Sequence, residues 1–152
     1  MSSGLRSQVL VPHEMQTILW RKLIVNAAIN PIAALLNTPN GHVGACEWTR
    51  RSVEAVVQEA VGIAEREHVD LQATEQEMVE YVLRVATNTS ENVCSTLADL
   101  RKGARTEIDA LTGQIVCSGK KHGVPTPVNA LLFDLVKALE AQRLRALRPE
   151  DS

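Results

Sequence analysis

The stretch that most constrains this chain of 152 residues runs from Trp20 to Gly41, with the sequence WRKLIVNAAINPIAALLNTPNG. It is apolar enough to form a core helix, yet it places Lys22, Asn26 and Asn30 four residues apart. Side chains at that spacing stack along one face of an α-helix. A lysine and two carboxamides are costly to bury without partners, so either other protein groups or a polar ligand must satisfy them.

Pro31 interrupts the same apolar pattern. Because proline has no N–H, the Ala27 carbonyl loses its helical partner, and we expect the helix to bend or restart there. Asn30 precedes the proline and is biased away from helical geometry, so its side chain is a candidate cap for a second half over residues 32–36. The sequence therefore predicts a first helix over about residues 14–36, bent near the proline.

Composition favours an all-α fold and limits the classes of partner. Aromatic residues make up only 3% of the chain, so the core must consist mainly of Leu, Val, Ile and Ala, which suits helix packing. The net charge is −2, the pI is about 6.1 and no basic stripe occurs, which argues against a nucleic-acid partner. No apolar run approaches the roughly 18 residues of a membrane-spanning helix. The N-terminus lacks the apolar core of a signal peptide, so we expect a cytoplasmic location.

A second long helix is predicted from about Arg50 to Glu67. Its apolar residues follow the helical period, and Glu59 falls on the outer face. Between the two long helices, Asn40-Gly41 is typical of a turn, and the following HVGACEW segment is ambiguous.

Thr74 and Glu77 form a capping box that begins a third helix. If this helix continues far enough, its inner face changes from apolar to polar and carries Asn92 and Ser95. The segment STLADLRKG that follows is typical of a short helix or turn, which Gly103 ends.

Thr106 is the expected N-cap of the next helix, with Asp109 at the third position. Glu107 falls in the first turn, where the helix dipole favours a negative charge. Gly113 and Gly119 inside this helix each cost about 1 kcal/mol relative to alanine. Close approach of a neighbouring helix would explain both glycines.

The last helix is predicted to begin at Thr126-Pro127, because threonine caps well and proline at the first helical position loses no hydrogen bond. The chain then divides into a mobile lead-in or appended remnant over residues 1–12, one helical domain over residues 13–142 and a frayed tail over residues 143–152. The predicted fold class is all-α, a bundle of five or six main helices joined by short loops.

Seven polar residues are candidates for one shared site: Lys22, Asn26, Asn30, Asn40, Asn92, Ser95 and Glu107. The residues alone leave two interpretations open. In the structural one, the asparagines cap broken helix ends, the lysine extends to solvent and the glutamate complements a helix dipole. In the functional one, the lysine holds a small anionic ligand, and the amides and the hydroxyl bind its other oxygens.

Other kinds of site find little support in the sequence. The four histidines are scattered without an HxxxH or HExxH pattern, so we expect no metal site. Ser95 has no histidine near it in sequence to indicate a Ser-His-Asp triad. Three widely spaced cysteines without a CxxC are expected to be reduced thiols. No GxG pair occurs, which excludes the usual Rossmann fingerprint and the P-loop.

Three separated segments resemble one known family. LWRKLIVNAAINPIAALLNTPNG resembles the opening helix of the C-terminal domain of ketopantoate reductase, also called 2-dehydropantoate 2-reductase. ENVCSTLADLRKGARTEIDALTG and KKHGVPTPVNALLFDLVKALE continue the resemblance in the same order, over about residues 11–140. The family fold is a Rossmann domain followed by a helical domain similar to the C-terminal domains of the 6-phosphogluconate dehydrogenase superfamily.

The resemblance implies NADPH-dependent reduction of 2-dehydropantoate to (R)-pantoate, on the route to pantothenate and coenzyme A. It implies that Lys22 is the general acid and that Glu107 and its neighbour Asn92 lie on the cofactor side. It implies substrate-binding roles for Asn26, Asn30, Asn40 and Ser95. The chemistry suits these residue types, since hydride addition to a ketone builds negative charge on its oxygen, which a lysine can stabilise and protonate.

The family's nucleotide-binding half has no counterpart in this sequence. We therefore expect the chain alone to be inactive or nearly so, with 2-dehydropantoate or pantoate and a Rossmann domain as partners, and a homodimer as a further possibility. Two alternatives stay open at this point. One is a reductase domain for another branched 2-oxo acid, and the other is a non-catalytic helical module that dimerises through its apolar faces.

Overall fold

The computed structural model describes residues 12–146. All of the regular secondary structure over that range is helical, which confirms the predicted all-α class. The predicted lead-in, apart from its last residue, and the tail beyond residue 146 lie outside the described residues. The helices are α2 (His13–Leu36), α3 (Asn40–Ala45), α4 (Glu47–Arg66), α5 (Glu75–Asn88), α6 (Ser95–Lys102), α7 (Thr112–His122) and α8 (Pro127–Ala146).

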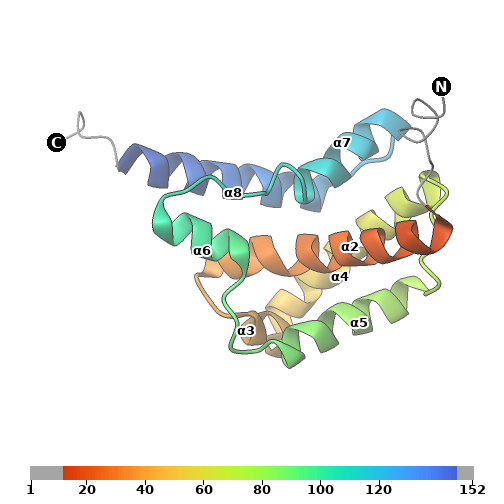
Figure 1. Ribbon diagram of the computed structural model, residues 1–152, viewed down its shortest axis with the longest axis horizontal. Helices are drawn as coiled ribbons and strands as arrows, with labels where there is room; N and C mark the ends of the chain where they lie inside the picture. The colour runs from red at the N-terminus through yellow and green to blue at the C-terminus, as the bar shows by residue number, and fades with distance from the viewer. Residues whose placement is uncertain (1–11, 147–152) are drawn as a thin grey trace, which may run out of the picture.

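Helix α2 is the central element of the bundle. It contacts α3, α4, α5, α6 and α8, and in Figure 1 it runs between α8 on one side and α5 on the other. Every residue from Ala27 to Ala34 is buried, because neighbouring helices cover this part of α2 on all sides. By length and composition α2 is apolar enough to cross a membrane, contrary to the expectation from the sequence. Its packing against five other helices identifies it as the core helix of this bundle.

Helix α2 continues through Pro31 without a break, so of the two expected outcomes, a bend or a restart, the restart does not occur. Pro31 is buried with its neighbours, and the shared core holds both halves in one helix despite the missing N–H. Asn30 therefore lies inside the helix and does not cap a second half. The helix ends where Asn37 adopts a left-handed conformation with φ of 52° and donates its backbone N–H to the last turn.

The prediction for α5 is confirmed at its start but not at its end. Thr74 Oγ1 accepts a hydrogen bond from Glu77 N at 3.1 Å, and the Glu77 carboxylate accepts one from Thr74 N at 3.2 Å. The helix stops at Asn88 and does not extend through Asn92 and Ser95. Asn92 lies in the connecting loop, and Ser95 is the first residue of α6.

Glu59 does not lie on a solvent-facing side of α4, contrary to the prediction. Its carboxylate accepts hydrogen bonds from the backbone N–H groups of Val128 and Asn129, both at 2.9 Å, and from the Asn129 side chain at 2.8 Å. The helical period of α4 could not reveal this, because the donors belong to another helix. This contact between helices satisfies the first free N–H groups of α8, which begins at Pro127 as predicted.

Thr106 does not begin a helix, so this prediction is also wrong. The chain instead makes a series of turns over residues 107–111, and α7 starts at Thr112. The N–H and the hydroxyl of Thr106 both donate to Glu140 on α8, an acceptor that the local sequence does not contain. The close approach expected from a neighbouring helix is confirmed at Gly113, where a Cβ atom would lie 3.0 Å from Phe133 on α8. It is wrong at Gly119, where a Cβ atom would lie 2.8 Å from the Val124 carbonyl in the loop that follows α7.

Candidate functional site

A cavity of about 600 Å³ lies beside the N-terminal half of α2. The end of α4, the turns after residue 106 and the start of α7 form its other walls. Three residues singled out in the sequence, Lys22, Asn26 and Glu107, line it together. The remaining lining residues are Gln16, Leu19, Trp20, Leu23, Glu67, Val69, Leu111 and Gln114.

The spacing in α2 explains how two of these groups come to share the cavity. Lys22 and Asn26 are four residues apart in a continuous helix and therefore project from the same face. Lys22 is exposed and Asn26 is half-buried. Glu107 is exposed and reaches the cavity from the turn that precedes α7.

Within the described residues, the side chains of Lys22, Asn26 and Glu107 have neither hydrogen-bond nor ion-pair partners. Lys22 and Glu107 line one cavity but do not form an ion pair with each other. Three polar side chains that converge without partners can bind the polar atoms of a ligand. If the Lys22 ammonium and the Glu107 carboxylate lay on separate faces of the bundle, one small ligand could not contact both.

Asn30 continues the same face of α2 into the core. It is 7% exposed, and its carboxamide has no hydrogen-bond partner among the described residues. Its backbone carbonyl accepts a hydrogen bond from the Cys94 thiol at 3.7 Å, which brings the start of α6 against α2. Ser95, the next residue, is exposed. Neither Asn30 nor Ser95 lines the 600 Å³ cavity.

Asn40 and Asn92 contact each other and also lie outside that cavity. The backbone N–H of Asn40 donates to the Asn92 carbonyl at 3.0 Å. The Asn40 side chain donates to Thr89 Oγ1 at 3.1 Å, while its buried carbonyl oxygen has no partner. The fold therefore groups the predicted site residues in two places: Lys22, Asn26 and Glu107 at the cavity, and the remaining four around the loop before α6 and the second half of α2.

No sequence pattern singled out Glu67, which also lines the cavity. His122 Nε2 lies 3.2 Å from Glu67 Oε1, within ion-pair distance but not aligned for a hydrogen bond. The contact with His122 is the main cause that holds the pKa of Glu67 below its ordinary value. The two residues lie 55 positions apart at the ends of α4 and α7, so no local pattern connects them.

A second cavity, of about 390 Å³, shares Lys22 with the first. Its other walls are mostly apolar and include Arg21 and Tyr81, whose ring the Arg21 guanidinium covers at 4.6 Å. The described residues contain no group of three or more His, Cys, Asp or Glu side chains that could hold a metal ion. Cys46, Cys94 and Cys117 are all free thiols.

Comparison with known proteins identifies the family. Residues 14–140 match the family described as the ketopantoate reductase PanE/ApbA C-terminal domain. This chain belongs to that family. A 2-dehydropantoate 2-reductase of Pyrobaculum aerophilum is 40% identical over 134 residues, which are 88% of this chain and 47% of that protein. One of Salmonella typhi is 34% identical over 143 residues, 94% of this chain and 46% of that protein.

Solved structures of ketopantoate reductases share the helical fold. The crystal structure of a PanE/ApbA family ketopantoate reductase from Ralstonia eutropha JMP134 superimposes with a TM-score of 0.77 at 33% identity, over 84% of this chain and 42% of that one. A ternary structure of D-mandelate dehydrogenase with NADH and anilino(oxo)acetate gives a TM-score of 0.79 at 26% identity, over 85% of this chain and 53% of that one. The chain spans about half the length of the curated relatives that it matches.

Proposed function

We propose that this chain is the substrate-binding and proton-donating domain of an NADPH-dependent reductase that converts 2-dehydropantoate to (R)-pantoate. One observation carries the proposal: in a chain of the ketopantoate reductase family, the unpartnered side chains of Lys22, Asn26 and Glu107 line one cavity of about 600 Å³. That volume is within the usual range of small-molecule sites, roughly 300–1,000 Å³.

Lys22 has the chemistry of the general acid. Hydride addition to the keto carbon moves the π electrons of the C=O bond onto its oxygen, where negative charge develops. The Lys22 ammonium stabilises this charge and transfers a proton to the oxygen, which yields the alcohol. Because Lys22 is exposed, solvent can return a proton to its amine after product leaves.

The amides complete the proposed substrate site. The Asn26 carboxamide is on the same face of α2 as Lys22, where it offers both donors and an acceptor to the substrate's carboxylate and hydroxyl. Asn30 and Ser95 are proposed to extend the site toward α6, and the contact between Cys94 and Asn30 supports their proximity. For Asn40 as a substrate ligand and Asn92 near the cofactor, the support is the family resemblance alone.

The residues of this chain do not form a dinucleotide site by themselves. The sequence has no glycine-rich phosphate loop, and the cavity has the size of a site for a small acid. We infer that a nucleotide-binding half, like that of the longer relatives, holds most of the NADPH and that Glu107 faces it from this chain. The cofactor, when bound, supplies the hydride. Without that half, turnover by this chain should be negligible.

The likeness to D-mandelate dehydrogenase favours a second candidate, reduction of another 2-oxo acid. That enzyme's structure contains NADH and anilino(oxo)acetate, so a similar helical fold accommodates a different 2-oxo acid and a different nicotinamide cofactor. Comparing kcat/KM for 2-dehydropantoate and for other branched and aromatic 2-oxo acids, with NADPH and with NADH, decides between the candidates.

Titration of pantoate into the isotopically labelled chain, followed by NMR, tests the proposed site directly. We expect the largest shifts at Lys22, Asn26 and Glu107, and loss of binding in Lys22→Ala. Lys102→Ala, which removes an exposed lysine at the end of α6, is the matched control and should bind as the wild type does. Absence of any shift in the wild-type chain would contradict the assignment.

Reconstitution tests the reaction and the remaining alternative. The chain is mixed with a separately produced nucleotide-binding half of a relative, and NADPH oxidation is followed by absorbance in the presence of 2-dehydropantoate. We expect activity with the wild-type chain and a loss of orders of magnitude with Lys22→Ala. A non-catalytic dimerisation module predicts neither pantoate binding nor restored activity, and sedimentation of the same samples reports whether the chain forms a homodimer.

A further inference from the structure

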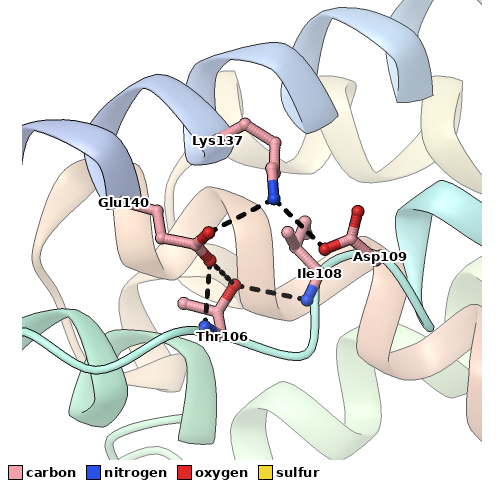
Figure 2. Close-up of polar contacts among 5 residues, drawn as sticks. All are labelled: Thr106, Ile108, Asp109, Lys137 and Glu140. Atoms are coloured by element: carbon pink, nitrogen blue, oxygen red, sulfur yellow. Dashed lines mark hydrogen bonds and ion pairs between the residues drawn. The ribbon is translucent and has the colours of Figure 1, made fainter. Parts of the chain in front are cut away.

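A buried carboxylate on α8 anchors the turn that carries Glu107. Glu140 is 5% exposed, and both of its oxygens are bonded (Figure 2). Oε2 accepts hydrogen bonds from Thr106 N at 2.9 Å and from Thr106 Oγ1 at 2.8 Å, and Oε1 accepts one from Lys137 Nζ at 3.2 Å. A carboxylate at this depth is tolerated only because these donors compensate its lost hydration.

The same network contacts the turn on the other side of Glu107. Lys137 Nζ also donates to Asp109 Oδ2 at 3.2 Å, as Figure 2 shows. Between these two contacts, Ile108 is fully buried, and its N–H donates to Thr106 Oγ1 at 3.3 Å. Helix α8 therefore holds the residue immediately before Glu107 and the residue two positions after it.

Glu107 itself receives no such support. Its side chain has no partner among the described residues, and it precedes α7, so no helical ladder fixes its backbone. The N–H groups of Ala110 and Leu111 donate to its carbonyl, at 3.0 and 3.2 Å, which closes the turn locally. The place of the Glu107 carboxylate relative to Lys22 thus depends on what holds residues 106–109 against the bundle.

We propose that Glu140 is a positioning residue for the cavity: acting through Thr106, it holds the turn that presents Glu107 opposite Lys22. Glu140 does not line the cavity. The inference rests on the proposed function, because it assigns Glu140 a role in the same site. A merely structural Glu140 would affect the stability of the bundle but would leave the affinity for substrate unchanged.

The test compares four single variants. Glu140→Gln and Thr106→Val each weaken the anchor, the second without replacing a charged residue. Thr106→Ser keeps the hydroxyl donor and is the conservative rescue. Glu59→Gln is the matched control, since it alters another interhelical carboxylate that binds α8 at its opposite end.

Amide hydrogen exchange of the folded chain measures the anchoring itself. Exchange at Ala110 and Leu111 should be about tenfold faster in Glu140→Gln and Thr106→Val, the factor expected when a hydrogen bond to a charged group is lost. Exchange at these amides in Thr106→Ser should match the wild type, and in Glu59→Gln it should rise no more than exchange elsewhere in the bundle does. Equal exchange in all variants would show that the turn does not depend on Glu140.

Pantoate titration measures the consequence for the site. We expect the dissociation constant to rise about tenfold in Glu140→Gln and Thr106→Val and to recover in Thr106→Ser. The double variant Glu140→Gln/Glu107→Gln should bind no more weakly than Glu107→Gln alone, because the anchor acts only through that side chain.

The outcomes separate the two proposals. If the wild-type chain binds pantoate and Glu140→Gln binds equally well despite faster exchange, Glu140 is only structural and the inference fails while the proposed function stands. Additive losses in the double variant would equally refute a role through Glu107. If the wild-type chain does not bind pantoate at all, both proposals fall.

Discussion

Replacing Glu59 with glutamine tests whether a contact between helices, invisible in the local sequence, determines the stability of the bundle. The Glu59 carboxylate on α4 accepts three hydrogen bonds from the first turn of α8, two from backbone N–H groups and one from the Asn129 side chain. Glutamine is nearly isosteric but carries only one acceptor oxygen and turns a donor toward one of these N–H groups.

The expected loss follows from these contacts. At least one backbone N–H at the start of α8 is left unpaired, and a hydrogen bond to a charged group contributes about 1.5–3 kcal/mol. The favourable interaction of a negative charge with the helix N-terminus, about 0.3–1 kcal/mol, is lost as well. Because Glu59 is half-buried, solvent screens part of both contributions. We expect a decrease of about 2–3 kcal/mol in the free energy of unfolding, or roughly 5–10 °C in Tm for a domain of this size.

Urea denaturation followed by circular dichroism measures this difference. Glu54→Gln is the matched control, because Glu54 is an exposed glutamate on the same helix and has no bonded partner among the described residues. It should change stability by less than about 0.5 kcal/mol, as surface substitutions usually do. If Glu59→Gln and Glu54→Gln are equally stable, the three hydrogen bonds to the Glu59 carboxylate do not stabilise the fold, and the reasoning about α8 is refuted.

Three further predictions concern the core and its polar groups. Gly119→Ala should cost about 1–3 kcal/mol in urea denaturation, since its Cβ would lie 2.8 Å from the Val124 carbonyl, whereas Gly62→Ala, with nothing within 4 Å, should stabilise α4 by up to about 1 kcal/mol. Burial raises the pKa of Glu140, but its bonds to Thr106 and Lys137 together outweigh burial and lower it. The ionised Glu140 carboxylate therefore stabilises the fold above the ordinary glutamate pKa, and this contribution is lost as the pH falls through the lowered pKa of Glu140. The free energy of unfolding of Glu140→Gln, measured by urea denaturation at several pH values, should therefore decrease less in acid than that of the wild type. Asn30→Leu should change stability little, because a carboxamide without a partner among the described residues is replaced by an apolar group with the same number of heavy atoms, but should weaken pantoate binding in the NMR titration.

Several features set by neighbouring residues were predicted correctly, although Asn40-Gly41, expected as a turn, begins helix α3. The capping box of Thr74 and Glu77 is confirmed, and so is Pro127 as the first residue of α8. Gly103 ends α6 with a φ of 70°, a left-handed conformation that glycine adopts without strain. In each case the physical cause lies within a few residues of the feature, so the sequence contains it.

Features set by distant partners were predicted wrongly. Thr106 has the sequence of an N-cap, but Glu140, 34 positions later, takes both of its donors, and the helix begins further on. Glu59 was expected on an exposed face, yet its donors lie 69 and 70 positions away. The spacing of apolar residues and the capping pattern each describe one helix at a time, and neither shows which helix packs beside it.

The residues of the candidate site show the same contrast between local and distant causes. Lys22 and Asn26 share a face because they share a helix, which the four-residue spacing predicts. Glu107 lines the same cavity from the turn after Thr106, which is bonded to α8, and no pattern in the sequence shows this. Asn30 marks the other end of the polar row, where the most buried part of α2 retains a carboxamide that solvent still reaches and that has no hydrogen-bond partner among the described residues. Leucine would bury more apolar surface at that position, and our proposal that the polar row on α2 serves to bind a ligand accounts for the carboxamide there.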